Sequence, residues 1–496
     1  MRLGANAVAA ASVLGGRALI AAGLRRAPEG WRRTVGILLR SEPTRFALSA
    51  FALTVPGGDT AVALQSFLAG EPDAHFSLEW YAPVTIRRRT AIVDLTVLDF
   101  DDGGRLRTIT PVLSSSGPAS PPADVSARVH EAILAAYNGT TRLPEIERPQ
   151  TLRREVMARV GSGDAAALGY ARRLLASCCL WFERRDLSDP SQRFCPPRFA
   201  ARRALGFSYL SFVARPAEEG TIDLWASAHH VGLDGVPLQD LLDRLERAWG
   251  TKPIAFPPAS VGAPFIAAHP CHAPGERAVD LVTTFVDMAP VIALRRELNA
   301  KYSRDIGGEV TVGALIAWLL SQEPEFAGVR IASTIDVAAS GGYERDVDVV
   351  SLRPADFAKG GGPWDGFVEF AREFNRMIVL SRSRTSPVRV GMQTAGLLPA
   401  WAHSAVVRSN PAALDATFGT LCITIVRNAR VFIAPMTDLG LGHGFFAIGN
   451  MNLPSQNGRA VTSVSIKGEA GRVSGYPAIL QRAIDRAAAM QAGARL

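Results

Sequence analysis

The stretch SAHHVGLDGVPLQDLL, residues 227–242, joins two different patterns of apolar residues through a short turn. Before the turn, apolar side chains alternate with polar ones over residues 221–230, which predicts a half-buried β-strand. After the turn, leucines recur at helical spacing from Leu238 to Leu245, and Pro237 stands near the start of that helix. The sequence therefore predicts a strand, a tight turn and a helix, with adjacent histidines where the strand ends.

The residues of this turn suit general base catalysis. A neutral imidazole near pH 7 can take the proton of a hydroxyl, amine or thiol that attacks a carbonyl. His230 at the strand end can face a channel, whereas His229 points to the opposite face because side chains alternate along a strand. Asp234 can hold the turn through an arginine or backbone amides, and Gly235 permits tight packing. The alternative is that His230 is a satisfied buried histidine in a protein without activity.

Length and composition are those of a globular protein with more than one domain. The chain has 496 residues, of which 48% are hydrophobic and 20% are charged. Its net charge of +8 comes with an excess of arginine, a residue that suits phosphate and carboxylate partners. The alternative is a soluble, arginine-rich protein without such a partner. We expect no nucleic-acid partner.

The cysteines point to a reducing compartment. There are 5 of them, an odd number, and their spacing fits neither a disulfide framework nor a zinc site. The segment HPCH, residues 269–272, contains metal-ligand residue types, but it is Pro-rich and lacks a second ligand pair. We therefore interpret it as part of a linker and expect no bound metal.

The N-terminal segment is apolar but too short to span a membrane. Its apolar run from Ala5 to Gly16 ends at Arg17. We predict a helical extension over residues 1–50, which packs on the protein body or lies on a membrane surface through arginines such as Arg25 and Arg26. The expected location is the cytoplasm, with peripheral membrane contact through this segment as an alternative.

A Pro-rich stretch near the middle divides the remaining chain. We predict a first lobe over residues 51–250, a linker over 251–278 and a second lobe over 279–496. Strand-like and helix-like segments follow one another in mixed order in both lobes, without regular βαβ alternation. This order favours an α+β fold in which each lobe is a mixed β-sheet with helices packed on one face.

The residues HHVGLDG, 229–235, resemble the His-His-x-x-x-Asp-Gly motif of the chloramphenicol acetyltransferase-like superfamily. That group includes dihydrolipoyl acyltransferase cores, condensation domains of nonribosomal peptide synthesis and wax ester/diacylglycerol acyltransferases. The resemblance implies that His230 is the base and that Asp234 orients the turn, with His229 and Gly235 as supporting residues. The segment FVDMAPVIALRRELNAKY, residues 285–302, is similar to the opening of a dihydrolipoyl acyltransferase catalytic domain.

A degenerate second copy of the motif follows in VSIKGEAGRVSGYP, residues 464–477. In this resemblance Ala470 occupies the histidine position and Ser474 the aspartate position, while Gly475 remains. One intact and one degenerate motif imply two fused lobes, with the active-site channel between them. The strand FGTLCITIVRN, residues 418–428, resembles one that carries an oxyanion-stabilising serine in trimeric relatives, and Thr424 matches that serine. The alternative is that Thr424 is an ordinary strand threonine.

The resemblance implies an acyltransferase of the HxxxD type. The donor would be a thioester, either acyl-CoA or an acyl carrier protein with its phosphopantetheine arm, and no cofactor would be bound permanently. The acceptor would be a hydroxyl or amine on a small molecule or a lipid. Three alternatives stay open: a nonribosomal-type condensation enzyme, a lipid or wax ester synthase, and a catalytically inactive scaffold for binding or assembly.

Overall fold

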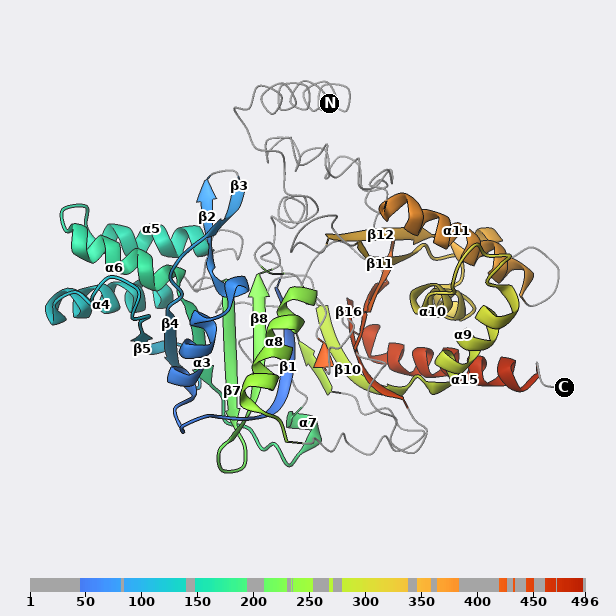
Figure 1. Ribbon diagram of the computed structural model, residues 1–496, viewed down its shortest axis with the longest axis horizontal. Helices are drawn as coiled ribbons and strands as arrows, with labels where there is room; N and C mark the ends of the chain where they lie inside the picture. Colours follow the sequence, from blue (N-terminus) through green and yellow to red (C-terminus); the bar gives the residue numbers. More distant parts are fainter. Residues whose placement is uncertain are drawn as a thin grey trace, which may run out of the picture. The chain divides into compact units, whose positions relative to one another are not determined.

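The structure is a computed structural model of the chain (Figure 1). It contains the predicted strand that leads to the two histidines and the predicted helix that follows them. The structure describes residues 45–81, 84–139, 148–193, 209–229, 233, 235–252, 267–270, 279–337, 346–357, 364–382, 419–425, 431–432, 443–449, 460–469 and 471–493. These residues divide into two compact units. We name the described residues from 45 to 252 the N-terminal unit and those from 267 to 493 the C-terminal unit.

Two short segments differ from the predicted division of the chain. Residues 45–50, which were expected in a helical extension, begin strand β1 (Arg45–Thr54), and the earlier part of the extension lies outside the described residues. Residues 267–270 of the predicted linker form the short strand β9 (Ala267–Pro270), which pairs with β10 (Val279–Asp287). In both cases a neighbouring strand supplies hydrogen-bond partners that the local sequence does not reveal.

The N-terminal unit is built on a mixed sheet with the strand order β1-β8-β7-β6-β4-β5. Strand β6 runs parallel to both β4 and β7, whereas the other neighbours pair antiparallel. Besides β1, the strands are β8 (Thr221–His229), β7 (Leu210–Pro216), β6 (Cys178–Phe182), β4 (Leu95–Phe100) and β5 (Leu106–Val112). Strand β8, which ends in the histidine motif, is therefore an interior strand with a hydrogen-bonded neighbour on each side.

Helices of the N-terminal unit cover this sheet in two groups (Figure 1). Helix α8 contacts β1 and β8, and α3 contacts β4 and β5; α4, α5 and α6 pack on one another, with α4 also against β5. A separate hairpin pairs β2 with β3. The bounds are α3 (Thr60–Ala69), α4 (Ala123–Gly139), α5 (Arg148–Val160), α6 (Ala165–Ala176), α7 (Pro190–Arg193), α8 (Gly235–Trp249), β2 (Phe76–Tyr81) and β3 (Val84–Arg89).

The C-terminal unit repeats this architecture with the strand order β12-β11-β13-β15-β16-β10-β9. Helix α10 is almost entirely apolar and buried, and α9, α11 and α15 share one hydrophobic core with it and with one face of the sheet. The remaining bounds are β11 (Ile331–Val337), β12 (Asp346–Leu352), β13 (Leu421–Ile425), β15 (Gly444–Ile448), β16 (Val461–Glu469), α9 (Ala289–Tyr302), α10 (Val312–Ser321), α11 (Asp365–Arg382) and α15 (Tyr476–Gly493).

The two sheets have the same topology, including strand directions. The order β5-β4-β6-β7-β8-β1 corresponds to β12-β11-β13-β15-β16-β10, and in both the parallel pairs are those among the second, third and fourth strands. In both, a helix follows the fifth strand of this order, α8 after β8 and α15 after β16. The predicted α+β fold of two similar mixed sheets is therefore confirmed.

Strand β8 is buried on both faces, which corrects the half-buried strand expected from its alternating pattern. Asp223, Trp225 and Ser227 expose only 0%, 1% and 3% of their surface. Asp223 can be buried because its Oδ1 accepts hydrogen bonds from the backbone N–H of Ala52 at 2.9 Å and from Arg193 at 3.1 Å. In the alternating pattern of β8, Asp223 is therefore a buried residue with hydrogen-bond partners and does not face solvent.

A second buried charge reinforces this arrangement. The Arg215 guanidinium donates two hydrogen bonds to Glu183, at 2.9 and 3.0 Å, and lies 5.2 Å from the ring centroid of Trp225. Burial lowers the pKa of Arg215 to about 10, and the opposing charge of Glu183 counteracts that effect. Arg215 on β7 lies opposite Asp223 on β8, so these charges sit where the two strands pair.

Asp223 also stabilises an irregularity in β1. The register of β1 shifts between Ala50 and Leu53, and Ala52 has a φ of 49°, in the left-handed region that residues with a side chain rarely adopt. The hydrogen bond from Ala52 to Asp223 compensates for that backbone conformation. One carboxylate therefore holds the register of β8 against β1 while its charge is balanced by arginine.

We expect Asp223→Ala to destabilise the protein by about 1–3 kcal/mol, because it removes the hydrogen-bond partner of the Ala52 N–H and of the partly buried Arg193 guanidinium. Urea unfolding monitored by circular dichroism measures this change. The control is Asp99→Ala in β4, an exposed position, which should change the free energy of unfolding by less than about 0.5 kcal/mol. Equal effects of the two substitutions would contradict the assigned role of Asp223.

Candidate active site

The histidine motif follows the end of a strand that is held on both sides. Strand β8 ends at His229, which lies opposite Arg45 of β1, and its neighbour Ala228 lies opposite Leu210 of β7. Antiparallel ladders on both sides keep the end of the strand in a fixed register. The C-terminal end of β8, at His229, is therefore a defined point of the sheet.

Helix α8 holds the other end of the turn. It begins at Gly235, and its leucines are fully or almost fully buried. Leu233, within the turn, exposes only 1% of its surface. The buried leucines of the helix are Leu238, Leu241, Leu242 and Leu245. A turn that is anchored at both ends and in its middle is suited to presenting a side chain rigidly.

The structure does not describe every predicted site residue. His230 and Asp234 lie outside the described residues, and of His229 and Gly235 only the backbone is described. Their roles as base, orienting carboxylate and supporting residues therefore stay predictions. The structure does establish the predicted context of a strand that ends at His229 and a helix that begins at Gly235.

The equivalent place in the C-terminal unit follows from the repeated topology. Strand β10 begins at Val279 opposite Glu469, the last residue of β16, just as β1 begins at Arg45 opposite His229. The residue after the strand is His230 in one unit and Ala470 in the other, which agrees with the alignment of the two motifs by sequence. Ala470 itself lies outside the described residues. Strand ends and sequence alignment thus lead to the same correspondence.

Ser474, which stands where the first motif has Asp234, lacks a carboxylate. It is exposed, and its Oγ donates a 3.4 Å hydrogen bond to the backbone carbonyl of Gly471 in the same turn. A hydroxyl that bonds its own turn holds neither an arginine nor a histidine. Only the N-terminal unit therefore carries the residue types of an intact motif.

Thr424 lies on the sheet face of the C-terminal unit that is opposite to the helices. Its neighbours Ile423 and Ile425 contact the hydrophobic core, so alternation along β13 turns Thr424 to the other face. Thr424 is partly exposed, and its hydroxyl lies 2.5 Å from that of Thr334 on β11, with either oxygen able to act as donor. When Thr334 donates to Thr424, the Thr424 proton is free to donate elsewhere, and the bond polarises it.

A row of four small residues, three of which carry a hydroxyl, runs from Thr424 across this face. The ladder pairs Thr424 with Ala447, Ala447 with Ser465, and Ser465 with Thr283. Thr283 is fully buried, and its hydroxyl has no hydrogen-bond partner. Sequence reasoning singled out Thr424 alone. Ser465 also alternates with apolar residues in the sequence, which could have indicated the same face of the sheet. Only the pairing of the strands shows that it lies in one row with Thr424 and Thr283.

The described cysteines are not candidate nucleophiles. Cys178, Cys179 and Cys422 are buried, and burial raises the pKa of both Cys178 and Cys422 to about 12. The thiols of Cys178 and Cys422 are therefore protonated at neutral pH. Among the described residues, no group of three or more histidines, cysteines, aspartates or glutamates is arranged to hold a metal ion. None of the described helices combines the length and hydropathy needed to cross a membrane.

No protein-family model and no curated protein matches the chain. Among solved structures, the wax ester synthase/diacylglycerol acyltransferase from Marinobacter aquaeolei VT8 is 11% identical, with 93% of this chain and 98% of that chain covered at a TM-score of 0.39. The starter condensation domain of rhizomide synthetase, in complex with C8-CoA and Leu-SNAC, is 11% identical, with 92% and 93% covered at a TM-score of 0.44. The dihydrolipoamide acetyltransferase of Azotobacter vinelandii is 16% identical, with 43% and 83% covered at a TM-score of 0.29.

The identities of these three matches are 11–16% and their TM-scores are 0.29–0.44, so they carry no argument about the reaction.

We expect the buried thiols to make the protein less stable as the pH rises. The unfolded chain releases a thiol proton near its ordinary pKa of 9.0, whereas folded Cys422 keeps its proton to about pH 12. Stability from this group is therefore complete below about pH 9 and is lost between about pH 9 and 12, by up to about 4 kcal/mol. Urea unfolding across this range should show a shallower decline for Cys422→Ala than for the wild type; parallel curves would contradict the assignment.

Proposed function

We propose that the chain is an acyltransferase that moves an acyl group from a thioester donor to a hydroxyl or amine acceptor. The observation that carries this proposal is the placement of the motif: an interior strand ends at His229, and a packed helix begins at Gly235. The residues between them include His230 and Asp234, the base and the orienting carboxylate of the family motif that the sequence resembles. The corresponding turn of the other unit has neither residue type.

His230 would act as the general base and then as the general acid. Its neutral imidazole would take the proton of the acceptor hydroxyl or amine while the acceptor oxygen or nitrogen attacks the thioester carbonyl carbon. The tetrahedral intermediate would collapse with cleavage of the carbon–sulfur bond. The imidazolium would return the proton to the departing thiolate, so the ring ends in its starting protonation state.

Thr424 would donate a hydrogen bond to the oxyanion of the tetrahedral intermediate. Thr424 is partly exposed and its hydroxyl lies 2.5 Å from that of Thr334, so two hydroxyl protons serve one hydrogen bond and one proton of the pair remains for a ligand. A preorganised donor of this kind contributes about 3–4 kcal/mol to transition-state stabilisation. Asp234 would orient the motif turn without exchanging protons, and His229 and Gly235 would support its geometry.

The donor would be acyl-CoA or an acyl carrier protein, both of which present the thioester on a phosphopantetheine arm. The arginine excess of the chain suits the phosphate groups of such a donor. The acceptor would be a small molecule or a lipid, and its identity separates the condensation and ester synthase alternatives. We also propose a cytoplasmic location, with the arginine-flanked N-terminal segment as a peripheral membrane contact if the acceptor is a lipid.

We expect His230→Ala to lower the rate of thiol release from acyl-CoA by about 10²–10⁴-fold in the presence of an acceptor. The measurement uses a panel of acyl-CoAs, a thiol reagent, and mass spectrometry of the products formed with a cell extract. His130→Gln, a histidine replacement in α4 outside the motif, is the matched control and should keep the wild-type rate. Background-level release from the wild type and His230→Ala alike would favour the scaffold alternative.

We expect Thr424→Val to lower kcat by about 10²–10³-fold with little change in KM, because the lost bond forms in the transition state. Thr334→Val should lower kcat by less, since it removes only the polarising partner, and Thr334→Ser should restore most of the loss. Thr462→Val is the control, because Thr462 is a buried threonine of β16 whose hydroxyl has no partner. Wild-type kcat in Thr424→Val would remove Thr424 from the mechanism but leave His230 in it.

A further inference from the structure

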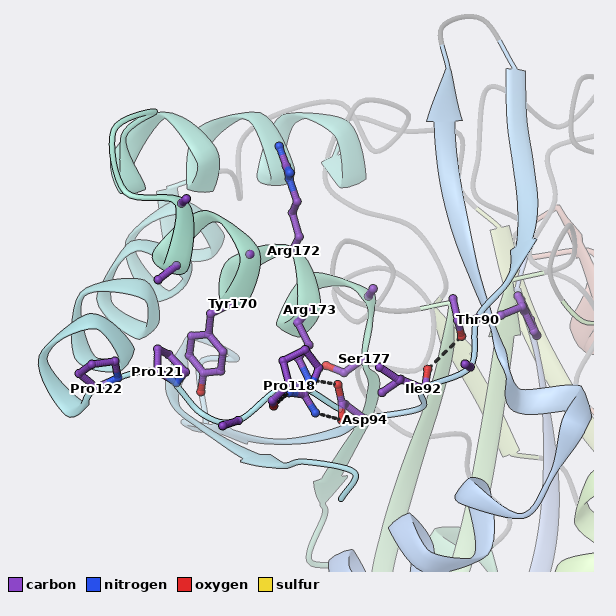
Figure 2. Close-up of a pocket in the computed structure, with 17 residues that line it drawn as sticks. Thr90, Ile92, Asp94, Pro118, Pro121, Pro122, Tyr170, Arg172, Arg173 and Ser177 are labelled. Carbon is purple, nitrogen blue, oxygen red and sulfur yellow. Dashed lines mark hydrogen bonds and ion pairs between the residues drawn. The ribbon is translucent and has the colours of Figure 1, made fainter. Parts of the chain in front are cut away.

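The N-terminal unit contains a cavity of about 640 Å³ that includes none of the motif residues. Its walls are α6, the Pro-rich loop before α4 and the segment before β4 (Figure 2). Proline rings, alanines, Ile92 and Phe76 contribute most of the lining, so the surface is mainly carbon. A volume of this size is that of a small-molecule site, which ranges from about 300 to 1,000 Å³.

The cavity is elongated along α6. Residues from Ala165 to Ala176 line it, and at about 1.5 Å of rise per residue they span about 16 Å. Figure 2 shows Pro121 and Pro122 at one end of the lining and Thr90 and Ile92 at the other. The small residues Ala166 and Gly169 on the helix leave room for an occupant. This shape favours an extended chain over a compact ring system.

The main charges inside the cavity neutralise each other. Arg173 donates to both carboxylate oxygens of Asp94, at 2.5 and 2.8 Å, and Asp94 also accepts the backbone N–H of Ser114 at 2.8 Å. The other polar lining groups bond within the protein: Thr90 donates to the carbonyl of Ile92, and Ser177 lies 2.6 Å from Thr96. Arg172 also touches the cavity, but its side chain extends away from the other lining residues (Figure 2). These pairings favour a neutral occupant.

The same ion pair holds the cavity open. Arg173 also donates to the backbone carbonyl of Pro118, which fixes the Pro-rich loop against α6. A Cβ at Gly117 in this loop would collide with the Arg173 guanidinium, so a larger residue there would displace the Arg173 side chain. The wall opposite α6 is therefore preformed by contacts inside the unit, and a ligand would not have to order it.

We propose that this cavity binds the hydrocarbon chain of a neutral lipid. An extended alkyl chain rises by about 1.3 Å per carbon, so about twelve carbons match the length of the lining along α6. The site does not depend on the acyl transfer proposed above, since its residues lie outside the motif and binding needs no thioester. Its test and the test of catalysis can therefore fail separately.

The experiment is a titration of the full-length protein with straight-chain primary alcohols from octanol to tetradecanol, followed by calorimetry. Affinity should rise by up to about 4-fold for each added methylene and then level off near dodecanol, where the chain reaches the end of the lining along α6. Gly169→Leu should weaken dodecanol binding at least 10-fold, because its side chain would project into the cavity. A Cβ at Gly169 meets no heavy atom within 4 Å, so this substitution needs no shift of neighbours.

Gly169→Ala is the matched control and should bind dodecanol nearly as well as the wild type. Both variants should keep the wild-type Tm or raise it, since alanine and leucine favour helix over glycine. The absence of alcohol binding, equal binding by Gly169→Leu, or affinity that does not depend on chain length would overturn the proposal. Dodecanoate that binds more than 10-fold tighter than dodecanol, and loses this advantage in Arg172→Gln, would overturn the neutral character of the site.

Discussion

The register of β8 against β1 and β7 is the constraint on which the candidate active site depends. Side chains alternate along a strand, so a slip of one residue would exchange the faces of His229 and the residues before it. Antiparallel ladders on both sides and the buried Asp223, bonded to Ala52 and Arg193, resist such a slip. Charges near the start of the strand thus help to hold the register of a strand that ends at His229.

Comparison of the two units shows which residues the shared strand topology does not require. Both units form the same order of strands with the same directions, and both place a turn and a helix after the fifth strand. The first turn contains histidines and Asp234, whereas the second contains Ala470 and the exposed Ser474. Packing therefore tolerates either set of turn residues, and the proposed acyl transfer would account for the first set.

Buried ion pairs act as positioning devices twice in the N-terminal unit. Asp223 holds strand register, and Asp94 with Arg173 holds the Pro-rich loop that forms one wall of the cavity. Such pairs contribute little net stability, because desolvation offsets much of their attraction. Their directional hydrogen bonds nevertheless determine where a loop or a strand lies. The cavity thus lies next to an ion pair that fixes its wall, and the motif follows a strand whose register depends on another ion pair.

The correspondence of Ala470 with His230 came from the resemblance of the two motifs to a known family, whereas local patterns in the sequence were sufficient for the strand before His230, the helix after the motif and the α+β class. These features depend on alternation, helical spacing and turn residues, which are properties of neighbouring positions. Tertiary structure alone decided the burial of Asp223, the pairing of Thr334 with Thr424 and the cavity beside α6. Asp223 and Ala52 are 171 positions apart, Thr334 and Thr424 are 90, and Asp94 and Arg173 are 79. Contacts over such separations form only when the whole unit packs, so no local pattern carries them.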